Sequence, residues 1–366
     1  MNQPELAARL RLRVGLSLLA SLVLPAAAAG PKSNATPGQR RKTVSDRAPE
    51  RMTYGGREEA MAFADDLATR NDLPAAWVRS VLAEARFIPA VTRLIMPPAA
   101  GIAKNWAAYR ARFVETQRIQ AGLAFARAQA VWLQRAEQRW GVAPEIVLGI
   151  IGVETFYGRL MGSFRVLDAL ATLSFDFPSG RSDRSPFFRD ELEHLILWSH
   201  SSQVHPSWPK GSFAGAIGLG QFMPSSIHRF GIDFDDDGRI DMVGSAADVI
   251  GSIGHYLAAH GWQRDLPTHF EVRAPVDTAA RAGLLVPDIR PSFSASQMAA
   301  AGAELPAPAQ AYDGLLALVE LQNGAAAPGF VAGTSNFYAL TRYNRSSYYA
   351  MAVIELGRAV VGAASS

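Results

Sequence analysis

The chain contains no cysteine among its 366 residues. Disulfide bonds, thiolate metal sites and lipid attachment through a cysteine are therefore excluded, so we expect no lipoprotein. An excess of charge is also missing, because 36 basic side chains stand against 33 acidic ones. No motif interleaves aromatic and basic residues in the manner of a nucleic-acid surface. We therefore expect no nucleic-acid partner.

Apolar runs long enough to cross a bilayer comfortably are missing as well. The longest candidate is at 14–24, where three arginines precede the run and small residues follow it at 25–29. This pattern predicts a cleavable secretory signal over residues 1–29, with an uncleaved anchor as the alternative. Removal of the signal would lower the formal net charge from +3 to +1, since the segment holds three arginines and Glu5.

The rest of the chain divides by composition and periodicity. Residues 30–55 are polar and proline-containing, which predicts a disordered linker. Apolar residues at three- and four-residue spacing predict a helical domain at 56–142, including one helical segment at 117–139. A core unit follows at 143–265. Short β-like segments predict a small β-containing domain at 266–333, and helical periodicity resumes in a C-terminal segment at 334–366.

The stretch from Pro144 to Gly162 holds one acid within a dense aliphatic run. Pro144 suits the first position of a helix, and Glu154 shares its helical face with Ile150 and Ile151. A carboxyl group on an apolar stripe is costly to ionise, so its pKa should rise toward that of a general acid at neutral pH. A buried ion pair of Glu154 with an arginine such as Arg159 or Arg165 is the alternative.

Glycines crowd a second stretch, Gly211–Ser226, at positions 211, 215, 218 and 220. Such spacing disfavours a helix and predicts a chain that turns tightly and lets a ligand or another backbone approach. Gln221 follows directly. The stretch lacks the ending of a phosphate loop, and Ser212 lacks the strand–turn context of a hydrolase nucleophile. A compact turn packed under the core is the alternative.

An acidic stretch follows at 233–248, and its pattern matches the first two-thirds of an EF-hand loop. The position that normally holds a bidentate Glu is Gly244, and the nearest closing acid is Asp248. We therefore predict a structural calcium site in a modified loop, with a solvated acidic turn as the alternative. The predicted ligands are the side chains of Asp233, Asp235, Asp237 and Asp248 and the carbonyl of Arg239. None of the seven histidines forms a zinc motif.

Taken in order, these stretches resemble the lytic murein transglycosylase B family, and the resemblance runs from about residue 60 to 357. The motifs that carry it are GVET at 152–155, LDALATLSF at 167–175, KGSFAGAIGLGQFMPSS at 210–226, AHGW at 259–262, TRYN at 341–344 and YAMA at 349–352. The resemblance implies an α+β, mainly α-helical protein. Its lysozyme-like catalytic core is expected to carry a helical domain and a small β-containing domain.

The resemblance also implies an activity, namely cleavage of the β-1,4 bond between N-acetylmuramic acid and N-acetylglucosamine in peptidoglycan. Glu154 matches the family's one catalytic acid. The muramoyl C6 hydroxyl attacks C1 and leaves a 1,6-anhydro product, so neither a second carboxylate nor a cofactor is required. A hydrolytic muramidase and a non-catalytic peptidoglycan-binding scaffold are the alternatives.

Further expectations rest on the same resemblance. Ser212 and Gln221 are expected to hydrogen-bond the sugar near Glu154, and Phe222 to pack along the groove. The other groove positions are Tyr109, Tyr256, Tyr343, Asn344 and Tyr349. We expect a periplasmic monomer that binds glycan strands, with cell-wall synthesis or division proteins as candidate partners.

Overall fold

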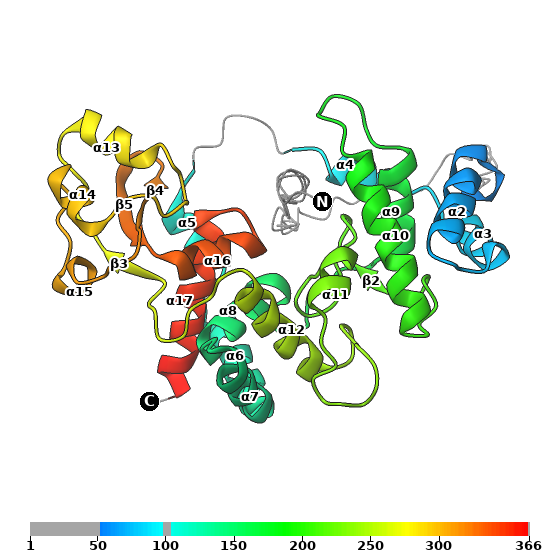
Figure 1. Ribbon diagram of the computed structural model, residues 1–366, viewed down its shortest axis with the longest axis horizontal. Coiled ribbons are helices and arrows are strands. Elements are labelled where there is room, and N and C mark those ends of the chain that lie inside the picture. The colour runs from blue at the N-terminus through cyan, green and yellow to red at the C-terminus, as the bar shows by residue number, and fades with distance from the viewer. Residues whose placement is uncertain (1–51, 98–103, 365–366) are drawn as a thin grey trace, which may run out of the picture.

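The computed structural model describes residues 52–97 and 104–364. The predicted signal at 1–29 and nearly all of the predicted linker therefore lie outside the described residues. Figure 1 shows a mostly helical protein with two small antiparallel sheets, which confirms the predicted α+β, mainly helical class. No helix of the described part has both the length and the apolar character needed to cross a membrane.

The helices of the described residues follow the apolar periodicity of the sequence. The N-terminal ones are the 3-10 turn η1 (Tyr54–Gly56), α2 (Glu58–Arg70), α3 (Ala75–Glu84) and α4 (Pro89–Leu94). Next come α5 (Trp106–Ala111), α6 (Thr116–Ala128), α7 (Ala130–Trp140), α8 (Pro144–Thr155), α9 (Val166–Phe175), α10 (Ser185–Ser201), α11 (Pro224–Phe230) and α12 (Ala246–Ala259). The last are α13 (Thr278–Leu285), α14 (Ala295–Ala300), α15 (Ala307–Gln310), α16 (Ser335–Tyr343) and α17 (Ser347–Ala364).

One predicted helical segment is divided in the structure. The periodicity at 117–139 predicted a single element, but α6 ends and α7 begins at Gln129. The backbone of Gln129 has φ −113° and ψ 18°, outside the helical range. The apolar pattern continues across the break because both helices pack on the same core, so periodicity alone gave no sign of it.

The centre of the molecule is the contact between α8 and α17, which are far apart in sequence. Glycines lie where the two helices approach most closely. A Cβ atom on Gly149 would lie 2.1 Å from the carbonyl oxygen of Val353, and one on Gly357 would lie 1.9 Å from that of Glu145. Neither position can therefore hold a larger residue unless the helices separate. Ile146 and Ile150 of α8 are fully buried in the large core around this contact.

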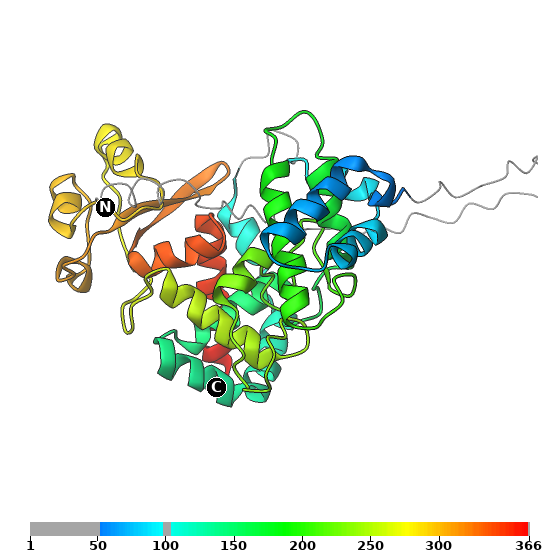
Figure 2. The same cartoon turned by 45° about the vertical axis from the view of Figure 1, so that its right-hand side comes forward.

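The N-terminal helices pack on α9 and α10, as both ribbon views show (Figures 1 and 2). Asp176, just after α9, accepts hydrogen bonds from the Tyr54 hydroxyl at 2.5 Å and the Arg57 guanidinium at 2.6 Å. By contrast, α6 packs on α8 and α17, and α7 packs on α12. All these helices share one apolar cluster. The boundary that we expected at residue 142 therefore does not separate two cores, because the apolar faces on either side of it cover each other.

A second, smaller core lies beside the three-stranded sheet of β3 (His269–Glu271), β4 (Ala317–Asn323) and β5 (Ala326–Gly333). The strand order is β3-β5-β4, with antiparallel pairing throughout. Leu284 and Met298 from α13 and α14 are buried against Leu318 of β4. After β5 the chain returns to the large core through α16 and α17.

The glycine contact between α8 and α17 predicts a stability effect. Gly357→Ala places a methyl group against the Glu145 carbonyl, so we expect it to lower the free energy of unfolding by about 1–3 kcal/mol. Gly362→Ala, on the same helix, is the control, because nothing lies within 4 Å of its Cβ position. Urea denaturation of the two variants checks this. If the two variants were equally stable, the close contact between α8 and α17 would not require glycine at position 357.

Candidate active site

Glu154 lies in the last turn of α8, where the backbone leaves the helix abruptly. Phe156 and Tyr157 follow with φ of 52° and 54°, in the left-handed region that non-glycine residues seldom adopt. The turn folds Tyr157 back over Gly152, since a Cβ there would lie 2.5 Å from the Tyr157 hydroxyl. Buried Arg118 donates to the Gly152 carbonyl at 2.5 Å, which stabilises the negative end of the helix dipole.

Burial raises the pKa of Glu154 from 4.5 to about 7, and the nearby Tyr349 hydroxyl lowers it in part. No hydrogen bond of ordinary length joins the two groups, however, because the buried Tyr349 hydroxyl has no partner within that range. The alternative of a buried ion pair is not supported. Arg159 lies over the Phe156 ring, Arg165 pairs with Asp168 at 3.4 Å, and no ion pair of Glu154 occurs among the described residues.

Two tyrosines from the C-terminal helices complete the surroundings of Glu154. The rings of Tyr343 and Tyr349 are almost parallel, with centroids 6.4 Å apart. Burial raises the pKa of both hydroxyls well above 10, and the charge of Glu154 raises it further. Both hydroxyls therefore remain protonated at physiological pH. The Tyr349 hydroxyl, which has no partner of ordinary length, can donate toward a carboxylate or a sugar oxygen.

The Gly-rich stretch is an irregular loop rather than a helix. It begins with β2 (Lys210–Gly211), which pairs with β1 (Phe164–Arg165). Gly218 has φ 71°, and a Cβ there would lie 1.7 Å from the Met242 carbonyl oxygen. Likewise, a Cβ atom on Gly211 would lie 2.0 Å from the Ala216 carbonyl oxygen. Another backbone therefore approaches these glycines closely, as predicted. The loop is also compact, which agrees with the alternative of a turn packed under the core.

Ser212 and Gln221 form hydrogen bonds within this loop, and each side chain retains a polar atom that can bind a ligand. The Ser212 hydroxyl oxygen accepts from the amides of Ala214 at 3.3 Å and Ala216 at 3.0 Å, so its proton is still available to a partner. Gln221 has φ 50°, and its amide group donates to the carbonyls of Gly218 and Met161 at 2.9 and 3.2 Å. Its Oε1 has no hydrogen-bond partner among the described residues.

Three further residues fix the loop beside Glu154, and sequence reasoning missed this role for each. The Thr155 hydroxyl donates to the Leu219 carbonyl at 2.9 Å, and the Tyr343 hydroxyl donates to the Gly220 carbonyl at 2.5 Å. Glu191 is 2% exposed and accepts from the amide and hydroxyl of Ser225, at the start of α11. An acid among buried Phe188, Leu192 and Leu195 was the available signal for Glu191.

The remaining predicted groove residues are less exposed than a sugar-stacking position requires. Phe222 is 3% exposed and contacts Tyr256 and Tyr343 edge to face, with centroids 6.0 and 5.5 Å away. The Tyr256 hydroxyl donates to the Arg342 carbonyl at 2.6 Å. Asn344 is buried at the end of α16. These residues therefore support Tyr343 from behind rather than offering flat faces to solvent.

Tyr109 lies on α5 and is half-buried. Its ring contacts Trp106 and Tyr348, with centroids 6.3 and 5.7 Å away. It also lies close enough to Tyr349 to raise the pKa of that hydroxyl. Tyr109 is thus linked to Glu154 through Tyr349, and its place in a substrate groove stays a prediction.

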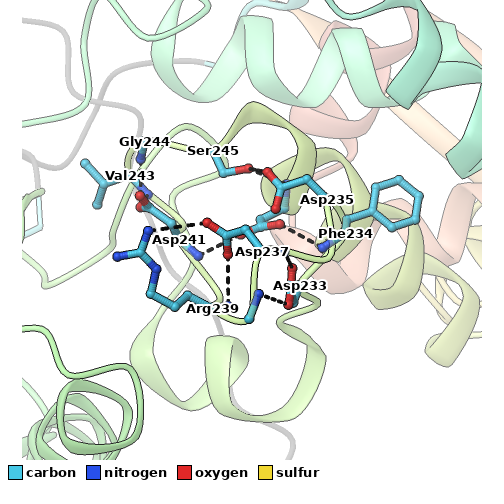
Figure 3. A network of polar contacts seen from close by, with 11 residues as sticks. Asp233, Phe234, Asp235, Asp237, Arg239, Asp241, Val243, Gly244 and Ser245 are labelled. Atoms are coloured by element: carbon cyan, nitrogen blue, oxygen red, sulfur yellow. Dashed lines mark hydrogen bonds and ion pairs between the residues drawn. The ribbon is translucent and has the colours of Figure 1, made fainter.

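The acidic stretch forms a loop before α12, shown in Figure 3. Carboxylate oxygens of Asp233, Asp235 and Asp248 lie within 4.8 Å of one another. Asp237 is not part of this group, because its carboxylate accepts from the Arg239 amide at 2.9 Å and pairs with the Arg239 guanidinium at 3.3 Å. The structure thus brings together three of the four predicted acids.

Charge and burial in this loop favour a cation. Asp235 Oδ2 accepts from the Ser245 hydroxyl at 2.8 Å, but its buried Oδ1 has no partner. Burial raises the pKa of Asp248, and Asp235 and Asp233 raise it further. A buried acceptor without a partner is costly, and a hard divalent cation held by carboxylates would satisfy it. The donor set therefore fits calcium.

The chain is similar to known proteins over most of its length. A profile of the family described as "Transglycosylase SLT domain" matches residues 56–358. Over 315 residues the chain is 37% identical to the membrane-bound lytic murein transglycosylase B of Escherichia coli K12, covering 84% of each. The structure of E. coli lytic transglycosylase Slt35 in complex with calcium has TM-score 0.73 and 36% identity, covering 86% of this chain and 97% of that one. SltB3 of Pseudomonas aeruginosa, solved with NAG-anhNAM-pentapeptide, has TM-score 0.71 and 27% identity, covering 83% and 79%.

The raised pKa of Glu154 predicts how stability depends on pH. The folded protein binds the carboxyl proton up to about pH 7, whereas the unfolded chain releases it near 4.5, so folding loses stability as pH rises between these values. Glu154→Gln removes this loss. We expect its stability advantage over the unsubstituted protein to grow by about 3 kcal/mol from pH 4 to pH 8. Denaturation at both pH values measures the free energies of unfolding, with Glu145→Gln on the same helix as control. If the difference between Glu154→Gln and the unsubstituted protein were the same at pH 4 and pH 8, burial would not raise the pKa of Glu154.

Proposed function

Because the chain belongs to the transglycosylase SLT domain family, we propose that Glu154 is the catalytic acid and base of the reaction that its relatives perform. The protein is a lytic transglycosylase that acts on peptidoglycan. The observation that carries the residue assignment is the raised pKa of Glu154, which lies beside two protonated tyrosine hydroxyls and has no cationic partner among the described residues.

In the first step Glu154 acts as a general acid. With a pKa of about 7, a large fraction of the carboxyl groups is protonated at neutral pH. The proton moves to the oxygen of the β-1,4 bond while the bond from that oxygen to the muramoyl C1 breaks. The N-acetylglucosamine side leaves as an alcohol. Glu154 is then a carboxylate, which the Tyr349 hydroxyl stabilises by its position.

In the second step Glu154 acts as a base. Its carboxylate takes the proton of the muramoyl C6 hydroxyl while that oxygen forms a bond to C1. The 1,6-anhydro ring closes, Glu154 is protonated again, and no water is consumed. A paired-acid glycosidase needs a second carboxylate beside the first. The single-acid reaction needs Glu154 alone, and a hydrolytic muramidase is the alternative.

The substrate is proposed to lie along the polar atoms and rings around Glu154. Ser212 can donate and Gln221 Oε1 can accept from hydroxyl or N-acetyl groups near the scissile bond. Half-buried Tyr109 offers a ring face and Tyr349 a hydroxyl, and buried Phe222, Tyr256, Tyr343 and Asn344 support them. Peptidoglycan strands carry stem peptides on their muramoyl units, and we propose that the enzyme acts on strands that bear them.

We further propose that the protein is an exported, periplasmic monomer. The basic, apolar and small-residue segments at 1–29 support export, and the absence of cysteine argues against a lipid anchor. Glycan strands are its proposed partners, and proteins of cell-wall synthesis or division are candidates for transient contact.

The catalytic proposal predicts a product. Digestion of peptidoglycan should yield fragments that end in 1,6-anhydromuramic acid, and mass spectrometry separates these from hydrolysed ends, which carry one additional water. Glu154→Gln should lower the rate by at least about a thousandfold, since it removes both proton transfers. Glu145→Gln, on the same helix, should retain the rate. Hydrolysed ends would identify a muramidase, and an active Glu154→Gln would remove Glu154 from the mechanism.

The acidic loop is proposed to hold a structural calcium ion. Asp233, Asp235 and Asp248 supply the carboxylates, and the Arg239 carbonyl is the further proposed ligand. The ion would offset the repulsion between the three acids and hold the loop between α11 and α12. It has no part in the proton transfers.

Calcium should therefore raise the melting temperature. At a calcium concentration one hundred times the dissociation constant the expected gain is about 2.7 kcal/mol, and a chelator should reverse it. Asp235→Asn should abolish the response. Asp236→Asn should retain it, because the Asp236 side chain is exposed and pairs with Arg135 outside the acidic group. If neither calcium nor chelator changed the melting temperature, the loop would be a solvated acidic turn without a bound ion.

A further inference from the structure

A cavity of about 220 Å³ lies where the small sheet domain meets the start of α17. Its wall combines residues from three separate parts of the chain. Lys104 and Tyr109 come from the segment that leads into α5, Ile289 from the loop after α13, and Tyr348 from α17. The other lining residues are Asp288, Arg345, Ser346 and Ser347.

The cavity carries more positive than negative charge. Lys104 and Arg345 are both exposed, and no ion pair or hydrogen bond of either side chain occurs among the described residues. Asp288 is the one acid in the lining, and it pairs with neither cation. The N-terminal end of α17, an 18-residue helix, adds partial positive charge at Ser347. Two cations without partners, beside hydroxyl groups, suit a carboxylate.

The cavity is built on fixed elements rather than on a loose surface. The Lys104 carbonyl accepts from the Gly324 amide at 2.9 Å, at the turn between β4 and β5. The Tyr348 hydroxyl donates to the Gln322 carbonyl at 2.7 Å, which joins α17 to the same hairpin. Ser346 accepts from the Tyr349 amide and so begins the helix. The backbones that carry the two cations are thus held by the sheet and by the helix.

The cavity shares one residue with the surroundings of the proposed active site. Tyr109 lines it, and Tyr109 lies close enough to Tyr349 to affect the pKa of that hydroxyl. Tyr349 in turn lies against Glu154. Tyr348 and Tyr349 are adjacent on α17, so one faces the cavity and the other faces Glu154. A strand that passes Glu154 and Tyr109 would therefore bring its substituents to Lys104 and Arg345.

We propose that this cavity is a subsite for a carboxylate of the stem peptide carried by the bound glycan strand, held by Lys104 and Arg345. The assignment rests on the proposed function, because it needs a strand in the groove beside Glu154. The sugar backbone is neutral in this region, whereas stem peptides carry free carboxylates. The subsite selects strands that bear peptides and adds binding energy away from the bond that breaks. Such binding lowers KM and leaves kcat unchanged.

The test compares three substrates with the full-length protein. These are glycan strands with intact stem peptides, strands whose carboxylates have been converted to amides, and strands freed of peptides by an amidase, whose newly formed lactyl carboxylates are then also converted to amides. The double variant Lys104→Gln/Arg345→Gln should raise KM for intact strands by roughly three- to tenfold and leave kcat unchanged. It should change neither constant for the amidated or peptide-free strands. Arg290→Gln is the matched control, because that exposed cation lies outside the cavity lining.

A second measurement does not depend on turnover. Calorimetry should show that the unsubstituted protein binds a muramoyl pentapeptide more tightly than its amidated form, and that the double variant binds both equally. An equal rise in KM on all three substrates, or no rise on intact strands, would overturn the subsite. Hydrolysed ends, or no cleavage by the unsubstituted protein, would instead reject the proposed function. The melting temperature of the double variant confirms that it folds.

Discussion

The close contact between α8 and α17 sets the position of the whole candidate site. Gly149 and Gly357 let the two backbones approach to a distance that no side chain would allow. Glu154 lies at the end of the first helix, and Tyr349 lies near the start of the second. The same contact leaves Glu154 half-buried beside the tyrosine. Packing and proton chemistry are therefore linked, because the separation of the two helices determines both the burial of the carboxyl group and its distance from the tyrosine.

Two opposing effects act on Glu154, and burial is the larger. Desolvation penalises the carboxylate, while the Tyr349 hydroxyl favours it, and the pKa settles at about 7. An arginine in contact would have lowered the pKa below that of an exposed acid. The sequence offers Arg159 and Arg165 nearby, but the left-handed turn at Phe156 directs the chain so that neither reaches the carboxyl group. This irregular turn preserves the reactivity of a group that can both give and take a proton.

The sequence alone located the carboxyl group and the loop that accompanies it. The spacing of Glu154 among aliphatic residues predicted its burial, and the crowded glycines predicted the close approach at Gly218. It could not show that Tyr343 and Tyr349 lie beside Glu154, because no local pattern links residues so far apart; only the family resemblance suggested it. The break at Gln129 was hidden for a similar reason, since both helices face one core.

Local hydrogen bonds determine which acids of the loop lie together, and the sequence pattern could not show this. Asp237 occupies a ligand position in the sequence, yet Arg239 two residues later supplies both an amide and a guanidinium to its carboxylate. Glu191 shows the opposite case. Its burial was visible in the spacing of α10, but its partner Ser225 comes from another helix, so its role in holding the loop required the fold.

The joining of α8 to α17 also has a consequence for the order in which the chain becomes active. Tyr349 and the other residues of α17 are synthesised long after Glu154, and closing so long a loop costs chain entropy before the contact forms. Until α17 has docked, Glu154 stays in water with an ordinary acidity and lacks its tyrosines. The capacity to cleave peptidoglycan therefore arises only when α17 has docked against α8.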